Sequence, residues 1–136
     1  MIKNLILAQL ATVLLCSSCS EIKTTDPEKA YYYWAGDSNH ERVGLINGSY
    51  WQTTHWTKEY ILYLEINASQ EWKTTFIQDN NLVKTTDGFT LSSDAPNWFD
   101  PPSSIDIYKS DDPFDQGSRY FIPSTDARCF IYEIQL

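Results

Sequence analysis

The sequence predicts an α+β fold, in which a small, mostly antiparallel β-sheet packs with one main helix at about residues 69–80. Residues 129–136 alternate between two faces, one of which carries Phe130, Tyr132, Ile134 and Leu136. Such alternation is typical of a strand, and a terminus this apolar is expected to be tied into the sheet. Residues 69–80 instead combine capping residues with apolar residues at helical spacing.

The folded part is expected to begin with the aromatic run Tyr31–Trp34, which suits a strand. Residues 42–46 and 49–53 form two further predicted strands. Asn47-Gly48 stands between them, and this dipeptide is a strong signal for a two-residue hairpin turn.

Residues 57–66 have two interpretations. The apolar residues from Tyr60 to Ile66 fit a well-buried strand. A single helix from Thr57 to Asn80 is the alternative, because apolar residues also recur every fourth position at Tyr60, Leu64, Ala68, Trp72 and Phe76. The high content of β-branched and aromatic residues favours the strand.

The main helix has a start, a face and an end in the sequence. Asn67-Ala68-Ser69 supplies capping residues, and Glu71 places a negative charge in the first turn, where it suits the helix dipole. Asn80-Asn81 provides a stop signal. The apolar face consists of Trp72, Phe76 and Ile77.

Shorter elements are predicted between the helix and the last strand. Residues 82–84 and 88–91 suggest a hairpin around Thr86-Asp87-Gly88. Three prolines exclude a regular element from the loop at residues 92–104. Residues 105–109 and 119–122 are predicted strands, separated by an acidic turn.

The first residues have the design of a secretory signal peptide, with Lys3, an apolar run from Leu5 to Leu15, and small residues after it. The run is shorter than the roughly 20 residues that span a bilayer. The stretch Leu15-Cys16-Ser17-Ser18-Cys19 resembles the lipobox of bacterial lipoproteins. An ordinary signal peptide cut nearby is the alternative.

The resemblance implies that Cys19 receives a diacylglyceryl group and becomes the first residue of the mature chain. Ser20 rather than Asp follows it, which in this class implies a place at the outer membrane, facing the periplasm. We then expect a signal peptide at 1–18, a flexible tether at 19–30, and a single globular domain at 31–136.

The composition limits which kinds of partner the domain is expected to bind. Without Lys3, eighteen acidic residues oppose nine Lys and Arg, so the mature side chains carry a formal charge of about −9. An acidic domain lacks the positive patch that a phosphate backbone requires, so we expect no nucleic-acid partner. The charge favours a basic partner. Cys129 is the sole thiol left in the domain, which excludes an internal disulfide.

No pattern of a catalytic, metal or cofactor site appears, so we expect neither an enzyme nor a cofactor. The two histidines are His40 and His55, and His55 would share a face with Glu59 only on a helix. A zinc site needs three or four ligands. Cys129 has no neighbouring feature of a reactive thiol.

Acidic residues gather in the turn that holds Asp111, Asp112 and Asp115. They lack the full calcium-loop pattern, which ends in a glutamate. We therefore expect these carboxylates to face water.

The loop at residues 94–102 carries the candidate ligand-contact residues Trp98 and Phe99 between its prolines. Exposed, the two rings would make a preorganised contact site. Folded back, they would plug the core, which is the commoner position of large apolar side chains.

These observations predict a lipid-anchored envelope lipoprotein with a small non-catalytic binding domain. Its partner would be a periplasmic or envelope protein, and an inhibitor or immunity protein fits the small size, the acidity and the anchor. One alternative is a module that binds glycan or peptidoglycan through Trp and Tyr rings. A small hydrolase is the least favoured alternative.

Overall fold

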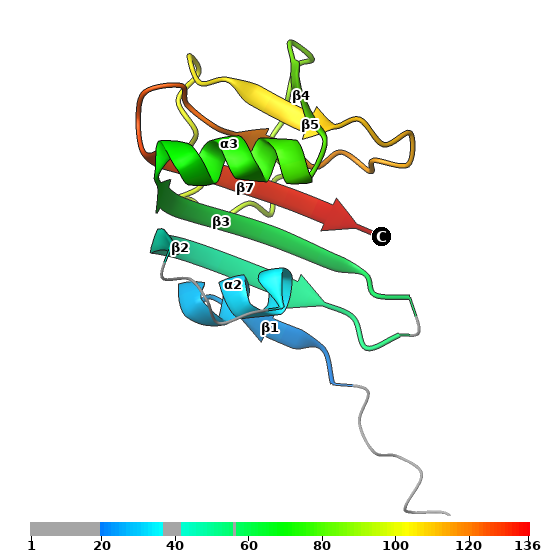
Figure 1. Ribbon diagram of the computed structural model, residues 1–136. Coiled ribbons are helices and arrows are strands. Elements are labelled where there is room, and N and C mark those ends of the chain that lie inside the picture. The colour runs from blue at the N-terminus through cyan, green and yellow to red at the C-terminus, as the bar shows by residue number, and fades with distance from the viewer. Residues whose placement is uncertain (1–19, 37–41, 56) are drawn as a thin grey trace, which may run out of the picture.

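The computed structural model describes residues 20–36, 42–55 and 57–136. One seven-stranded antiparallel sheet forms its centre, and two helices cover one face (Figure 1). The predicted α+β class is therefore confirmed. The strands are β1 (Ile22–Thr24), β2 (Val43–Gln52), β3 (Tyr60–Ala68), β4 (Leu82–Thr85), β5 (Ile107–Ser110), β6 (Arg119–Phe121) and β7 (Arg128–Gln135), in the spatial order β1-β2-β3-β7-β6-β5-β4. The helices are α2 (Pro27–Ala35) and α3 (Gln70–Asp79).

The segment expected to be a flexible tether is part of the fold. Strand β1 pairs with β2, and α2 covers residues 27–35. The flexible tether predicted at 19–30 is therefore wrong for its described residues 20–30, and the aromatic strand predicted at 31–34 is wrong as well. Asp26 caps α2, because its carboxylate accepts the backbone N–H of Glu28 at 2.9 Å. Pro27 occupies the first turn, where its missing N–H costs nothing, and Gly36 ends the helix with φ 68°. These end signals outweigh the β propensity of the tyrosines.

Strand β2 runs without a turn through Asn47-Gly48, so the predicted hairpin there is wrong. The register shifts between Leu45 and Asn47, as at a bulge. Gly48 lies beneath α2, where an added Cβ would come within 2.7 Å of the Pro27 Cα and 2.9 Å of the Ala30 Cβ. This glycine therefore allows the helix to approach the sheet.

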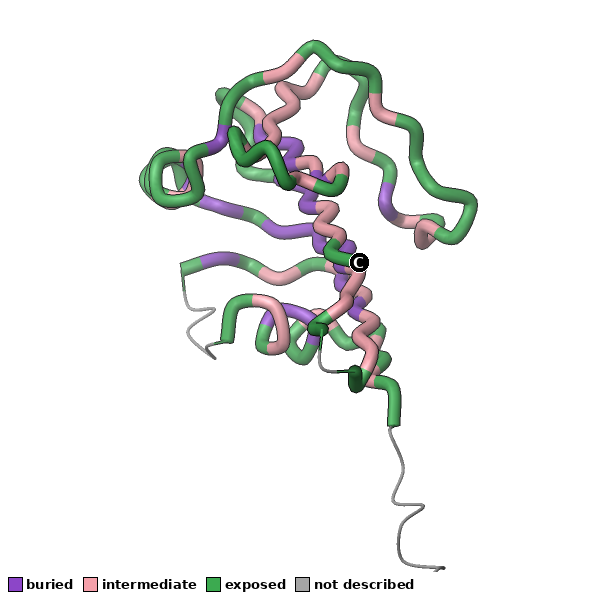
Figure 2. The backbone as a smooth tube through the Cα atoms, turned by 90° about the vertical axis from the view of Figure 1, so that its right-hand side faces the viewer, coloured by how far each residue is buried: buried purple, intermediate pink, exposed green. Residues whose placement is uncertain are grey.

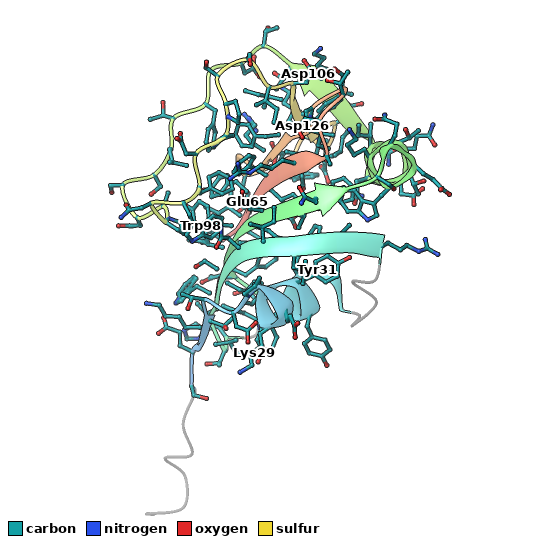
Figure 3. All side chains as sticks on the ribbon, turned by 90° about the vertical axis from the view of Figure 1, so that its left-hand side faces the viewer. Lys29, Tyr31, Glu65, Trp98, Asp106 and Asp126 are labelled. Carbon is teal, nitrogen blue, oxygen red and sulfur yellow. The ribbon has the colours of Figure 1, made fainter. Side chains whose placement is uncertain are left out.

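The predicted strand followed by a helix is confirmed at β3 and α3. Ser69 caps α3 by accepting the N–H of Trp72 at 3.1 Å. Buried Lys73 on α3 donates to the carbonyls of Pro123 at 2.8 Å and Asp126 at 2.9 Å. These bonds fasten the β6–β7 turn to the helix (Figure 3 labels Asp126).

Strand β4 pairs with β5 and not with residues 88–91, which form no strand. The predicted hairpin around Thr86-Asp87-Gly88 is therefore wrong. Strands β5, β6 and β7 lie where the sequence predicts them, within two residues at each end.

The sheet has a core on each face, and the buried residues follow its central strands (Figure 2). On the helix side, buried residues of β2, β3 and β7 meet α2 and α3. On the other side, residues 86–106 fold over the sheet and bury a second, aromatic cluster of Tyr63, Phe99, Phe121 and Phe130. None of the helices in the described part of the chain is long and apolar enough to cross a bilayer.

Candidate functional site

The main concavity of interest lies between α2 and α3, over the helix side of the sheet. A narrow part of about 420 Å³ is lined by Tyr31, Trp34, Trp72, Phe76, Tyr120 and Glu133, together with Ala35 and Asn80. A wider part of about 710 Å³ shares several of these residues and adds Arg42, Glu71 and Asp79 at its rim. We call the two parts together the helix groove.

Aromatic rings from both helices and the sheet form the wall of the helix groove. Trp72 and Phe76 are one turn apart on α3 and stack at 4.7 Å with an interplanar angle of 9°. Phe76 also meets Trp34 of α2 at 5.9 Å and Tyr120 of β6 at 5.6 Å. Because the rings hold one another, the groove wall is preorganised.

Glu133 of β7 is the polar centre of the groove. The Trp34 indole N–H and the Tyr120 hydroxyl each donate to its Oε2 at 3.0 Å. The Tyr60 hydroxyl of β3 donates to its Oε1. Among the residues that the structure describes, no Lys or Arg forms an ion pair with this carboxylate. Hence Glu133 is a half-buried anion that is oriented by neutral donors.

The two tyrosines that hold Glu133 resist ionisation. Burial is the largest cause that raises the pKa of Tyr60, followed by its hydrogen bond to Glu133. Burial and then the charge of Glu133 raise the pKa of Tyr120 in the same way. Both hydroxyls therefore remain donors across the neutral pH range.

A shallower hollow of about 350 Å³ continues from Glu133 toward the β5–β6 turn, where Asp112, Phe114 and Asp115 line it. Asp115 forms an ion pair with Arg119 at 3.2 Å and accepts the N–H of Ser118, so its role is structural. Asp111 and Asp112 are exposed, as expected. Nowhere in residues 20–36, 42–55 and 57–136 do three His, Cys, Asp or Glu side chains gather as metal ligands.

The predicted contact residues Trp98 and Phe99 lie on the opposite face of the sheet from the helix groove. Phe99 is 1 % exposed and meets Tyr63 at 5.1 Å and Phe130 at 5.7 Å. Trp98 is half-buried beside it, 5.9 Å away (Figure 3). An exposed contact site at Phe99 is therefore wrong, and the plug interpretation is confirmed for this ring.

The other residues considered from the sequence do not form a site together. His55 and Glu59 belong to the β2–β3 turn and not to a helix, so the shared helical face does not exist. Cys129 is fully buried, and burial raises the pKa of its thiol to about 11, which makes it unreactive at neutral pH. His40 and Cys19 lie outside the described residues.

An ion pair between a buried glutamate and a largely exposed arginine, which the sequence analysis missed, lies on the loop-covered face. Glu65 of β3 is fully buried and accepts from Asn47 Nδ2 at 2.8 Å. It also pairs with Arg128 of β7, whose guanidinium lies over the Phe130 ring. A glutamate within the apolar run of residues 60–66 is the sequence signal for such a pair, since a buried charge needs a partner.

The helix groove thus combines fixed aromatic rings with the carboxylates of Glu133, Glu71 and Asp79, none of which forms an ion pair in the described chain. Rings attract cations to their faces, and a carboxylate adds a direct charge partner. This combination suits a positively charged group of a ligand. Compared with protein-family models, with curated proteins and with solved structures, the chain finds no match in any of the three.

Proposed function

We propose that the chain is a lipid-anchored envelope protein, and that its domain binds a basic partner protein through the helix groove. The observation that carries this proposal is Glu133, a half-buried carboxylate set among aromatic rings without a described Lys or Arg beside it. A lysine or arginine side chain of the partner supplies the missing positive charge.

The charges around the groove support a cationic occupant. Glu71 and Asp79 line its wider part, and Arg42 is the basic residue among the described side chains that line it. The surplus of acidic groups agrees with the formal charge of about −9 for the mature chain. Acidic surfaces speed the encounter with basic partners and discriminate against acidic ones.

The aromatic wall adds to this attraction. Trp34 and Trp72 line the groove, and a cation within about 6 Å of a tryptophan face gains roughly 0.5–2 kcal/mol. Arginine in particular stacks on aromatic rings while its N–H groups pair with a carboxylate. An arginine that enters the groove would pair with the charge of Glu133 and pack on a tryptophan at once.

The support for the proposed lipid anchor comes from the sequence. The lipobox-like stretch ending at Cys19 supports lipidation there, and Ser20 supports an outer-membrane location with the domain in the periplasm. In this setting the partner is an envelope or periplasmic protein. Inhibition of a basic hydrolase, or immunity to a basic toxin, is the narrower form of the proposal.

Capture from an envelope extract tests this function. The mature wild-type protein should retain a basic protein at low salt and release it as the salt concentration rises, since screening weakens charge pairs. Glu133→Gln should retain at least tenfold less of it, whereas Asp100→Asn, at an exposed position on the loop-covered side, should retain the same amount as wild type. Equal retention by both variants would rule out the groove as the binding site.

A glycan-binding module is the second candidate, because Trp34 and Trp72 both line a groove. Sugars stack on such rings without needing a charge. Peptidoglycan fragments would then quench tryptophan fluorescence equally at low and high salt. A salt-dependent response to basic peptides, with no response to these fragments, separates the two candidates.

A further inference from the structure

The cysteine at which we propose lipidation closely precedes the edge strand in the sequence. Only Ser20 and Glu21 separate Cys19 from Ile22, the first residue of β1. An extended chain covers at most about 3.6 Å per residue, which places the Ile22 Cα within about 11 Å of the Cys19 Cα. A lipid on Cys19 would therefore hold the start of β1 close to the membrane surface.

The antiparallel register shows which part of the domain is brought to the lipid. Ile22 pairs with Gln52, which pairs with Tyr60, and Tyr60 in turn pairs with Gln135. The start of β1, the β2–β3 turn and the end of β7 thus lie at one end of the sheet, on the right in Figure 1. We call this the anchor end.

The β5–β6 turn belongs to the anchor end as well. The Gln116 side-chain amide donates to the carbonyl of Leu136 at 3.0 Å, which joins this turn to the chain after β7. Within the turn, the Phe114 N–H donates to Asp112 Oδ1 at 2.8 Å. The turn is therefore ordered by its own hydrogen bonds while it presents the Phe114 ring.

Two large apolar side chains are exposed at this end. Phe114 is 85 % exposed and Leu136 is 62 % exposed, more than the other exposed large hydrophobic residues that the structure describes. Water is an unfavourable environment for such a ring. Singly exposed apolar side chains are nevertheless common on protein surfaces, so the exposure of Phe114 does not by itself indicate a contact. The short link to Cys19 determines what lies there.

We propose that the anchor end is a membrane-contact surface, on which Phe114 and Leu136 enter the lipid interface once Cys19 is acylated. The proposal rests on the lipid anchor of the proposed function. Lys58 of the β2–β3 turn is exposed but lies over the Tyr60 ring, with its Nζ 5.5 Å from the centroid. Asp111 and Asp112 next to Phe114 disfavour a strongly anionic surface. The surface therefore fits a membrane rich in zwitterionic lipid.

This orientation sets the direction from which a partner reaches the helix groove. Arg42 precedes β2 and Ser69 follows β3 at the end of the sheet opposite the anchor end, and both line the wide part of the groove. The wide part runs along α3 from this end to Asp79 and Asn80. With the anchor end on the membrane, a basic partner reaches the groove at the end that Arg42 and Ser69 line, from the periplasmic side.

A depth measurement on the lipidated protein tests the contact. An environment-sensitive fluorophore is attached to Phe114→Cys and, as the control, to Ser124→Cys in the exposed β6–β7 turn at the opposite end. Buried Cys129 does not react, and acylated Cys19 has no free thiol. The proteins are placed in vesicles of phosphatidylethanolamine and phosphatidylcholine that contain nitroxide-labelled lipid.

The fluorophore at position 114 should be quenched at least threefold more than the one at position 124. Equal quenching would overturn the membrane contact, and a blue shift at 114 without quenching would assign the surface to a second copy of the chain instead. The intact mass of each sample reports the lipid. A chain without lipid would refute the anchor and this contact together, whereas a lipidated chain with equal quenching would refute the contact alone and leave the groove proposal standing.

Discussion

Glu133 brings together residues that no local pattern connects. Trp34 lies 99 residues before it in the chain, and Tyr60 lies 73 residues before it. Each of these donors would be an ordinary core aromatic without the carboxylate. The site at the residue scale is therefore one acid and three neutral donors, contributed by α2, β3, β6 and β7.

The pKa shifts of these tyrosines predict how stability depends on pH. Tyr60 and Tyr120 have pKa values raised above the ordinary value of about 10, so the folded state holds their protons more tightly than the unfolded chain. Their contribution is fully present below pH 10 and is lost as the pH rises above it. The free energy of unfolding should accordingly decline above pH 10 in denaturant titrations.

Tyr120→Phe provides the comparison for this alkaline decline. Without the hydroxyl, the slope of the free energy of unfolding against pH above 10 should be shallower than in the wild type. Tyr32→Phe is the matched control, because this ring is exposed. An identical slope in all three proteins would show that the raised pKa of Tyr120 does not contribute to the loss of stability above pH 10.

At the scale of elements, α2 depends on a glycine in the strand beneath it. Gly48→Ala should lower the free energy of unfolding by about 1–3 kcal/mol, because the new methyl would meet the Pro27 backbone at 2.7 Å. Gly88→Ala, where nothing lies within 4 Å, should change it by less than about 0.5 kcal/mol. Thermal unfolding followed by circular dichroism measures both, and equal effects would show that α2 does not pack this closely.

Elements with one dominant local signal could be predicted from the sequence. Helix α3 has Ser69 as a cap and Trp72 and Phe76 on one face, and β7 alternates along its whole length. Helix α2 was missed because three tyrosines favour a strand, although Asp26-Pro27 and Gly36 mark its ends. In this case local capping decided the structure against the propensity of the residues between the caps.

Signals that depend on tertiary packing could not be predicted. Asn47-Gly48 has the composition of a turn, yet Gly48 serves the approach of α2, which becomes visible only once the helix is in place. The partner of β4 is likewise β5, across a loop of more than twenty residues, rather than the nearer segment 88–91. The helix groove could not be predicted from the sequence either, because its walls come from elements that meet only in the folded protein.

At the scale of the whole molecule, the sheet separates two surfaces with different roles. The loop-covered side is closed by a buried aromatic cluster, with the Glu65–Arg128 pair beside it. The helix side leaves a groove whose carboxylate has no cationic partner in the described chain. Binding through the helix side leaves the loop-covered side free.

The most direct measurement is a titration of the mature protein with hexa-arginine, followed by tryptophan fluorescence at low and at moderate salt. Trp34 and Trp72 line the groove, so an occupant should change their emission. The wild type and Asp100→Asn should bind with the same salt-dependent affinity, and Glu133→Gln should bind at least tenfold more weakly while it keeps the wild-type circular dichroism spectrum. If Glu133→Gln bound hexa-arginine as tightly as the wild type, the helix groove would not be a site for a cationic group.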